Sequence, residues 1–365
     1  MPVAPSALVD SRMLRRSPRG VPVNSIARCV LLGGSGYIGS ALARLLVRHG
    51  VSVRIADLAP SAVLPNAWTR TDVRDESAVS AVLQGAETLY LLAAEHGLEP
   101  RPVHRFEETN IGGARAVVAA ARRTRLRRII FTSTVAVYGQ RREAATDDAP
   151  VAPTTAYGRT KLAAEQLLRA WANEDESRSL IIIRPTVVFG PGVRGQMRAL
   201  FHRVARPEFR LIGAGENRKS FAHVENLAAF HAHATTLPPG THLFNYTDGP
   251  DLTMREFAAT IRSAVGLGPA LPARARSAAL TRAAWQQLHA ALGGPTPEWT
   301  VAQIRRFCDD SRFLSTRAAA TGFSAPLTLA EGLAQYARSD LRWTAQRPSV
   351  TRSFTPTSRS DAPAV

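Results

Sequence analysis

Residues 28–186 contain apolar blocks of two kinds. Short uninterrupted runs, such as 30–32, predict buried strands, whereas runs that repeat every three or four residues, such as 40–47, predict helices facing a core. The two kinds alternate, which is typical of a parallel sheet covered by helices on both faces. The pattern therefore predicts an α/β fold with a doubly wound parallel sheet. Further strands are expected at 51–57, 67–72, 88–93, 128–133 and 180–187, and helices near 37–49, 75–83, 105–123 and 155–172.

The alternation gives way to shorter elements after Gly190-Pro191-Gly192. This change predicts a smaller C-terminal α+β substrate domain beside the first domain. Both ends of the chain are rich in Pro, Ser, Thr and Arg and lack periodicity, as in disordered segments. We expect a leader at 1–26, a nucleotide-binding domain at 27–190, a mainly substrate-binding domain at 191–345 with some elements returning to the first sheet, and a tail at 346–365.

Three glycines, Gly33, Gly36 and Gly39, join the first strand to the first helix. A helix that begins directly after such a turn presents unpaired N–H groups and the positive end of its dipole to an anion. The first glycine permits the turn, the second lets a pyrophosphate approach, and the third lets helix and strand pack closely. Asp57 ends the next strand, where a carboxylate accepts from a ribose 2′-hydroxyl and disfavours a 2′-phosphate. A Rossmann-type sheet that binds NAD is therefore expected.

Candidate catalytic residues lie at Tyr157 and Lys161, four residues apart on one predicted helix face. A free phenol has a pKa of about 10, and a nearby ammonium favours its ionised form. Such a pair suits proton transfer to and from an alcohol. Thr134 follows a predicted strand and supplies a hydroxyl to orient the substrate oxygen. We expect Tyr157 and Lys161 to contact the cofactor as well.

The chain carries 46 Lys and Arg residues and a net charge of +17, but its only lysines are Lys161 and Lys219. Arginine cannot replace lysine where a compact ammonium is needed, so both lysines become candidate functional residues. The arginines are not interleaved with aromatic residues and match no nucleic-acid motif. We interpret the charge mainly as a solvated surface and expect no specific nucleic-acid partner.

Two further features bear on location. No apolar run is long enough to span a bilayer, and the two cysteines, Cys29 and Cys308, lie far apart in apolar settings, as expected of reduced, buried thiols. These features predict a cytoplasmic protein.

The motifs together identify the chain as similar to the extended short-chain dehydrogenase/reductases of the NAD-dependent epimerase/dehydratase family, over about residues 28–344. The matching segments are 33–40, 71–75, 91–96, 132–139, 157–161, 184–192 and 221–226. The resemblance implies an enzyme that moves a hydride between NAD and a secondary alcohol carbon, with Thr134, Tyr157 and Lys161 catalytic. The further cofactor contacts that it implies are Tyr37, Ile38, Asp72, Val73, Leu92, Ala93, Ala94, Pro185 and Val188.

Substrate contacts are expected at His96, Thr134, Arg194 and Lys219. Residues 213–221 are similar to the segment in which nucleotide-sugar enzymes place a cation against a diphosphate, and Lys219 falls on that position. The chain also resembles the branch found with bacterial polysaccharide genes. The resemblance therefore implies a nucleotide-sugar substrate, and a homodimer is the expected assembly.

Two departures from the family pattern keep alternatives open. Val187 stands where epimerases of the UDP-galactose type carry Asn, and Val135 and Ala136 stand where 4,6-dehydratases carry an acid pair. Water elimination is therefore disfavoured, and epimerisation competes with dehydrogenation or reduction of a steroid or flavonoid substrate. A non-catalytic NAD-binding regulator is the alternative outside enzymes, which the intact catalytic residues disfavour.

Other conspicuous residues are interpreted structurally. The histidines His96, His223, His231 and His233 lack the spacing and the Cys or carboxylate partners of a metal set, so no metal is expected. Trp285, Leu288 and Leu292 at helical spacing are expected in the core. Because their helix is basic, peripheral membrane contact is the alternative.

Overall fold

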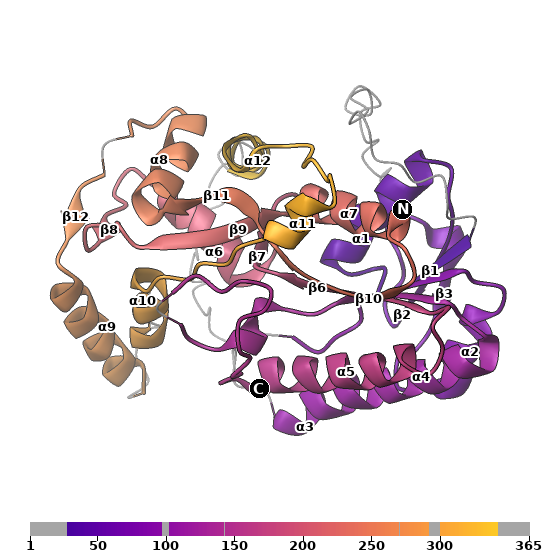
Figure 1. The fold of residues 1–365 in the computed structure, drawn as a ribbon. Coiled ribbons are helices and arrows are strands. Elements are labelled where there is room, and N and C mark those ends of the chain that lie inside the picture. The colour runs from indigo at the N-terminus through magenta and orange to yellow at the C-terminus, as the bar shows by residue number, and fades with distance from the viewer. Residues whose placement is uncertain (1–27, 97–101, 142, 270, 292–299, 342–365) are drawn as a thin grey trace, which may run out of the picture.

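The computed structural model describes residues 28–96, 102–141, 143–269, 271–291 and 300–341. Its main sheet has seven strands in the order β10-β6-β5-β4-β1-β2-β3, all parallel (Figure 1). The order reverses between β1 and β4, where open α/β sheets bind ligands at the strands' carboxyl ends. The doubly wound fold class is confirmed. The strands are Arg28–Leu32 (β1), Ser52–Asp57 (β2), Trp68–Arg70 (β3), Thr88–Leu91 (β4), Arg128–Thr132 (β5), Ser179–Pro185 (β6) and Gly240–Tyr246 (β10).

Helices cover both faces of this sheet (Figure 1). Helices α1 (Tyr37–Arg48) and α7 (Val224–His233) pack together on one face over a buried core. Helices α2 (Glu76–Leu83), α4 (Gly113–Thr124) and α5 (Ala156–Ala172) cover the other face over a second core. The central strands β1, β4, β5 and β6 are mostly apolar because both of their faces are buried, whereas β2, β3 and β10 are more polar and partly exposed.

Two predicted elements differ from the structure. The strand expected at 180–187 divides into β6 and β7 (Val187–Phe189), because Pro185 lacks an N–H and Thr186 N bonds Tyr246 O at 3.0 Å. The helix expected at 105–123 contains a π-helical segment, Glu107–Gly112, between α3 (Val103–Phe106) and α4. Asn110 lies in this wide turn and hydrogen-bonds with the backbone of Glu95, in the segment after β4.

The remaining elements build a smaller lobe around a third core. Phe201, Phe221, Phe257 and Tyr336 form its aromatic centre, with ring centroids 4.7–5.5 Å apart. The elements of this smaller lobe are α6 (Gly195–Val204), β8 (Leu211–Ile212), β9 (Arg218–His223), β11 (Asp248–Thr253), α8 (Met254–Ala264), β12 (Ala273–Arg274), α9 (Arg276–Ala291), α10 (Val301–Cys308) and α12 (Leu329–Tyr336).

The chain crosses between the two parts more than once. Strand β9 pairs with both β7 and β11, and β10 lies at the edge of the main sheet although it follows β9 in sequence. The short helix α11 (Thr316–Ala320) packs near β10. The proposed domain boundaries stay predictions, and the predicted leader and tail lie outside the described residues. Within the described part of the chain, no helix is both long and apolar enough to cross a membrane.

Candidate active site

The glycine turn follows β1 at the point where the strand order reverses. Gly33 has φ +89°, and a Cβ there would lie 2.4 Å from Ala93 N, so only glycine fits without a backbone shift. A Cβ at Gly39 would lie 2.6 Å from Gly33 O, which explains the close contact of helix and turn. A Cβ at Gly36 would meet only Gly33 O, at 3.2 Å. The backbone at Gly36 is therefore open to a ligand.

The residues around this turn fit a dinucleotide. Helix α1 begins at Tyr37, after the N-cap residue Gly36, with no side-chain cap and no acidic residue in its first turn, so its dipole is free to face an anion. Asp57 ends β2 beside the turn, and its carboxylate accepts from Ser35 N at 3.0 Å and Ala59 N at 3.1 Å. These bonds fix the carboxylate where a ribose hydroxyl is expected. Ile38 is partly buried against the core beneath α1.

Tyr37 joins the turn to the smaller lobe. Its ring carbons lie 3.7–3.8 Å from the position of a Cβ on Gly192, and its hydroxyl is buried without a hydrogen-bond partner. Burial raises the pKa of this phenol, with smaller contributions from Tyr336 and Glu225. Tyr37 therefore stays neutral.

Two of the expected cofactor contacts, Asp72 and Val73, lie after β3. Asp72 is held by Arg74, which donates to its two carboxylate oxygens at 3.0 and 2.6 Å, and this hydrogen bonding lowers the pKa of Asp72. Val73 is buried and packs so closely on α4 that a Cβ at Gly113 would come within 2.9 Å of it. This pairing sets the distance between the loop and α4.

The segment after β4 forms the neighbouring wall. Leu92 N and Ala93 N both donate to Leu32 O at 2.8 Å, and Leu92, Ala93 and Ala94 are partly exposed. Asn110 accepts from Glu95 N at 2.9 Å and donates to Glu95 O at 3.1 Å. It also donates to Thr160 Oγ1 at 3.0 Å. Asn110 thus ties this wall to the helix that carries Tyr157, a role that sequence reasoning missed.

The three candidate catalytic residues come together from two elements. Thr134 follows β5 and caps the 3₁₀ turn Val135–Tyr138, with its Oγ1 accepting from Ala136 N at 3.1 Å. Tyr157 lies in the first turn of α5 and hydrogen-bonds to Thr134. Lys161 lies one turn later and is 2% exposed, with its Nζ 4.1 Å from the centre of the Phe131 ring.

Burial moves both titratable groups toward their neutral forms. It raises the pKa of Tyr157 to about 12, against the hydrogen bond with Thr134, which lowers it. Burial also lowers the pKa of Lys161 to about 7, with the charge of Glu165 acting in the opposite direction. The pKa of Tyr157 thus moves opposite to the expected direction, because desolvation of the phenolate outweighs its favourable interactions.

A chain of buried polar residues lies beneath this site and was not anticipated from the sequence. Ser133 Oγ donates to Glu165, and Arg184 binds the same carboxylate through Nε at 2.9 Å and Nη2 at 2.6 Å. Arg184 also donates to Tyr138 Oη at 2.8 Å, and this hydroxyl donates to Asn245 Oδ1 at 2.8 Å. The chain joins β5, α5, β6 and β10. Two features of the sequence could have indicated this chain: Glu165 follows Lys161 by four residues, and Arg184 lies in an otherwise apolar strand.

The predicted nicotinamide border lies where β6 ends. Pro185 is buried as the last residue of β6, and Val188 is partly buried in β7. Val187 between them is exposed. The hydroxyl of Thr186 is buried without a hydrogen-bond partner.

The predicted substrate cations occupy two different places. Arg194 is exposed at the start of α6, and its side chain caps no N–H of that helix. Lys219 lies on β9, and its ammonium donates to the carbonyls of Arg306 at 2.8 Å and Asp309 at 2.7 Å. Lys219 therefore holds the C-terminal end of α10, where a cation suits the helix dipole. An ammonium has three donors, so this capping leaves one for a ligand.

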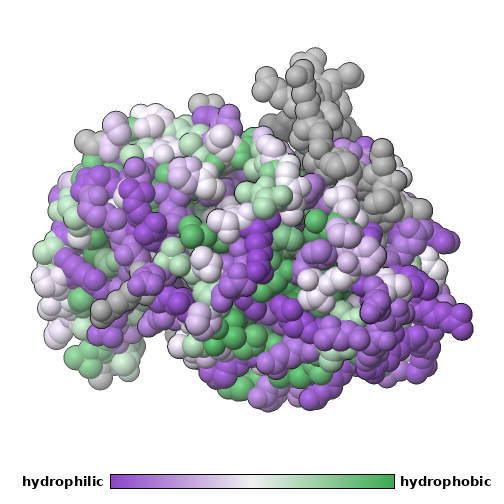
Figure 2. Space-filling model, viewed as in Figure 1, coloured by the Kyte–Doolittle hydropathy of each residue, from purple (hydrophilic) through white to green (hydrophobic). Residues whose placement is uncertain are grey.

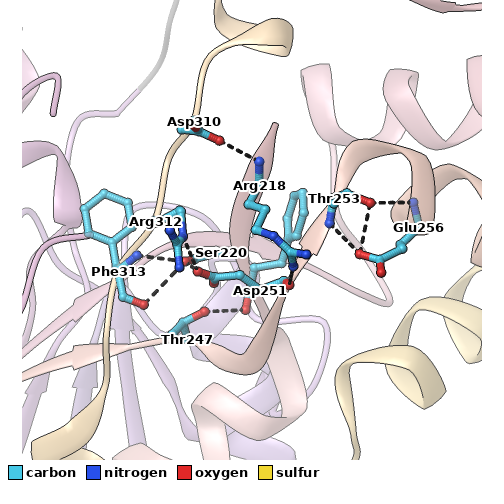
Figure 3. A network of polar contacts seen from close by, with 10 residues as sticks. Arg218, Ser220, Thr247, Asp251, Thr253, Glu256, Asp310, Arg312 and Phe313 are labelled. Atoms are coloured by element: carbon cyan, nitrogen blue, oxygen red, sulfur yellow. Dashed lines mark hydrogen bonds and ion pairs between the residues drawn. The ribbon is translucent and has the colours of Figure 1, made fainter. Parts of the chain in front are cut away.

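The two neighbours of Lys219 on β9, Arg218 and Ser220, make several polar contacts (Figure 3). The backbone N–H of Arg218 donates to the Asp310 carboxylate at 2.6 Å, and Arg218 Nη1 donates to Asp251 O at 2.9 Å. Ser220 donates to the Asp251 carboxylate and accepts from Phe313 N at 2.8 Å. These bonds attach the segment after α10 to β9 and β11.

The histidines do not converge on a metal. No group of His, Cys, Asp or Glu in the described residues could hold a metal ion. His96 is exposed at the end of the described wall after β4. His231 is buried and bonds Thr132 Oγ1 at 2.7 Å, whereas His223 ends β9 beside the Phe189 ring.

Two expectations about burial are wrong. Trp285 and Leu288 are exposed rather than in the core, because α9 turns its alanines, Ala279 and Ala283, inward. Leu292 lies outside the described residues. Cys308 is only partly buried, whereas Cys29 is fully buried, and both thiols are free.

Comparisons with known proteins agree with this geometry. The model of the NAD dependent epimerase/dehydratase family matches residues 29–245. An N-acetyl-alpha-D-glucosaminyl-diphospho-ditrans,octacis-undecaprenol 4-epimerase from Escherichia coli O157:H7 is 33% identical over 308 residues, or 83% of this chain and 92% of that protein. A 3 beta-hydroxysteroid dehydrogenase/Delta 5→4-isomerase from Mycobacterium tuberculosis is 26% identical over 327 residues, covering 84% and 88%.

Solved structures show the same fold. A UDP-glucose 4-epimerase from Thermotoga maritima, solved with UDP-glucose, has a TM-score of 0.68 at 20% identity over 87% of this chain and all of that one. The chain therefore belongs to the NAD-dependent epimerase/dehydratase family of extended short-chain dehydrogenase/reductases. It is an NAD-dependent enzyme of that family.

Proposed function

We propose that the protein is a 4-epimerase of a hexosamine carried on a diphosphate. The observation that carries the proposal is the contact of Tyr157 with Thr134, one helical turn from Lys161, at the carboxyl ends of the strands. This arrangement supplies one proton relay for one alcohol. It serves both halves of an epimerisation, in which the same carbon is oxidised and then reduced on its other face.

Each residue has a defined role in this reaction. The glycine turn and Asp57 hold the two ends of the NAD pyrophosphate–ribose unit, and Lys161 holds the second ribose. When bound, NAD accepts a hydride and gives it back. Thr134 orients the reacting oxygen, and Tyr157 takes its proton and later returns it. The hydride and the proton both return to the sugar, so the reaction consumes no cofactor.

The turn after Thr134 favours epimerisation over dehydration. Water elimination needs an additional acid and base beside the sugar, whereas Val135 and Ala136 follow Thr134 and supply no carboxylate. The similarity to the undecaprenol-linked 4-epimerase supports a sugar diphosphate whose second phosphate carries a polyprenol, in place of a nucleoside. Arg194 and the third donor of Lys219 are the proposed cations for this diphosphate.

The experiment offers the purified enzyme two substrates with NAD. These are N-acetylglucosaminyl-diphospho-undecaprenol in detergent and UDP-N-acetylglucosamine, with products separated by chromatography and assigned by NMR. We expect the C4 epimer from the polyprenol substrate without accumulation of NADH. Tyr157→Phe should abolish turnover while NAD affinity stays nearly unchanged, because only the proton relay is lost.

Two results would contradict the proposal. Stoichiometric NADH together with a ketone product indicates a dehydrogenase, as in the steroid-oxidising relative. Turnover of the UDP-sugar alone restricts the substrate to nucleotide sugars and removes the polyprenol carrier. A cytoplasmic location and a homodimer stay predictions, to be checked by fractionation and by light scattering.

A further inference from the structure

Helix α9 presents an apolar face to solvent. Trp285 and Leu288 are 67% and 56% exposed, the highest values among the large hydrophobic side chains that the structure describes. Ala278 and Thr281 are also exposed and precede them at spacings of three and four residues, so the four side chains share one side of the helix. We call this side the outer face of α9. Figure 2 shows hydrophobic residues at the lower left, where Figure 1 places α9.

The outer face is not the side by which α9 packs on the protein. Ala279 and Ala283, on the opposite side, are buried in the core of the smaller lobe with Ile304 and Phe307 of α10. The helix thus has a buried side of small residues and an exposed side that carries a tryptophan. Scattered single apolar residues are ordinary on a surface, but an aligned set with an aromatic residue is a typical binding face.

The helix is held firmly in this orientation. Gln287 accepts from Val301 N at 3.0 Å near one end of the α9–α10 pair, and Arg276 binds Asp309 at 3.1 Å near the other. The two helices are therefore antiparallel. Lys219 caps the far end of α10 (above), which links the pair to β9.

The charged side chains of α9 and α10 themselves have one sign. Arg282 is exposed on α9, three residues before Trp285, and Arg305 and Arg306 are exposed on α10. Neither helix contains an Asp or Glu; Glu298 lies in the connecting segment outside the described residues, and Asp309 and Asp310 follow α10. Tryptophan and leucine beside arginines, with no acid on the helix, match the chemistry of the interface of an anionic bilayer.

We propose that the outer face of α9 docks on an anionic lipid bilayer. The tryptophan and leucine enter the headgroup boundary, and the arginines contact the lipid phosphates. Docking places the smaller lobe at the surface in which a polyprenol-linked sugar is anchored. The choice of that substrate rests on the proposed function, whereas the docking surface is tested without any substrate.

The experiment measures co-flotation of the full chain with vesicles. One set of vesicles contains phosphatidylglycerol and phosphatidylethanolamine, and the other contains phosphatidylcholine alone. We expect the parent to float with the anionic vesicles and to be released by salt. The double variant Trp285→Ser/Leu288→Ser should lose binding at least tenfold, and Arg282→Gln about fivefold, as expected from about 1 kcal/mol per basic residue near an anionic surface. Every variant keeps residues 1–27 and 342–365, so differences report on α9.

Val47→Ser is the matched control, since Val47 is 44% exposed on α1, far from α9 in the fold (Figure 1). It should bind vesicles as the parent does. Circular dichroism and turnover of a water-soluble UDP-sugar, where the parent shows it, check that the double variant is folded. With the polyprenol substrate in vesicles, the double variant should be slower and the control should not.

Other results overturn the inference. If the parent does not float, or if the double variant floats equally well, the outer face does not bind lipid. If light scattering instead shows that the double variant loses a dimer that the parent forms, the face is an interface between two copies. Vesicle binding without any epimerisation leaves the docking surface in place and removes the proposed function alone.

Discussion

We expect the buried Lys161 to lower the free energy of unfolding of the protein. Its side chain is 2% exposed, and burial lowers its pKa from 10.5 to about 7. A protonated lysine in the unfolded chain must therefore lose its proton or its hydration on folding. At 1.36 kcal/mol per pKa unit, this difference opposes folding by about 4 kcal/mol near pH 7 in protein without NAD. Lys161→Met removes the charge and keeps most of the stem beside Phe131.

The pH dependence of this effect follows from the sign of the shift. Between about pH 7 and 10.5 the unfolded chain binds more protons than the folded one at Lys161, so its destabilising effect shrinks as pH rises. Below about pH 7 the effect is constant. Lys161→Met should therefore exceed the parent in stability most below pH 7, by up to about 5 kcal/mol, and should approach it near pH 10.5.

Urea unfolding at a series of pH values, with nucleotide removed, measures this difference. The same variant should be inactive, because the proposed ribose-binding ammonium one helical turn from Tyr157 is lost. Tyr157→Phe is the matched control on the same helix, since the pKa of the phenol is about 10 in the unfolded chain and about 12 in the folded one, and the phenol stays protonated in both below about pH 9. It should be inactive without changing the slope between about pH 7 and 9. A Lys161→Met variant that is less stable than the parent at pH 7 would refute the reasoning.

Three further predictions concern residues outside this pair. Glu165→Gln should cost about 3–5 kcal/mol of stability, because it leaves the buried Arg184 unpaired, whereas Glu174→Gln in an exposed pair should cost far less; equal costs in urea unfolding would exclude a buried network. Asp57→Ala should weaken NAD about 10-fold or more in calorimetric titration by removing a charge-assisted hydrogen bond, and should leave NADP unchanged or tighter; an unchanged NAD to NADP ratio counts against the assigned ribose contact. Lys219→Ala should raise KM for a sugar diphosphate and should lower stability, because the C-terminal end of α10 loses its cap. If Lys219→Met leaves KM unchanged, Lys219 caps α10 but does not bind the substrate.

The local signals in the sequence were sufficient for the nucleotide-binding half. Gly33 has a positive φ and a Cβ at Gly39 would lie 2.6 Å from Gly33 O, so both glycines are required by a turn whose geometry is set within a few residues. Tyr157 and Lys161 share a face because helical periodicity alone places them so. Buried strands and helices in this half also follow from short-range spacing, which is why their order could be read along the chain.

The interactions between distant segments were decided by the tertiary structure. Glu165 and Arg184 meet because α5 packs on β6, and Asn110 reaches Glu95 only through a π-helical segment that no spacing rule predicts. The pKa of Tyr157 depends on how much water the assembled site excludes, which the sequence does not contain.

The smaller lobe shows the same limit most clearly. Periodicity correctly placed Trp285 and Leu288 on one helix face but could not tell which face α9 buries. The side that carries Ala279 and Ala283 is buried because these small side chains let α9 pack closely on α10. The sequence determines which residues share a face, and packing between elements determines which face remains in contact with water.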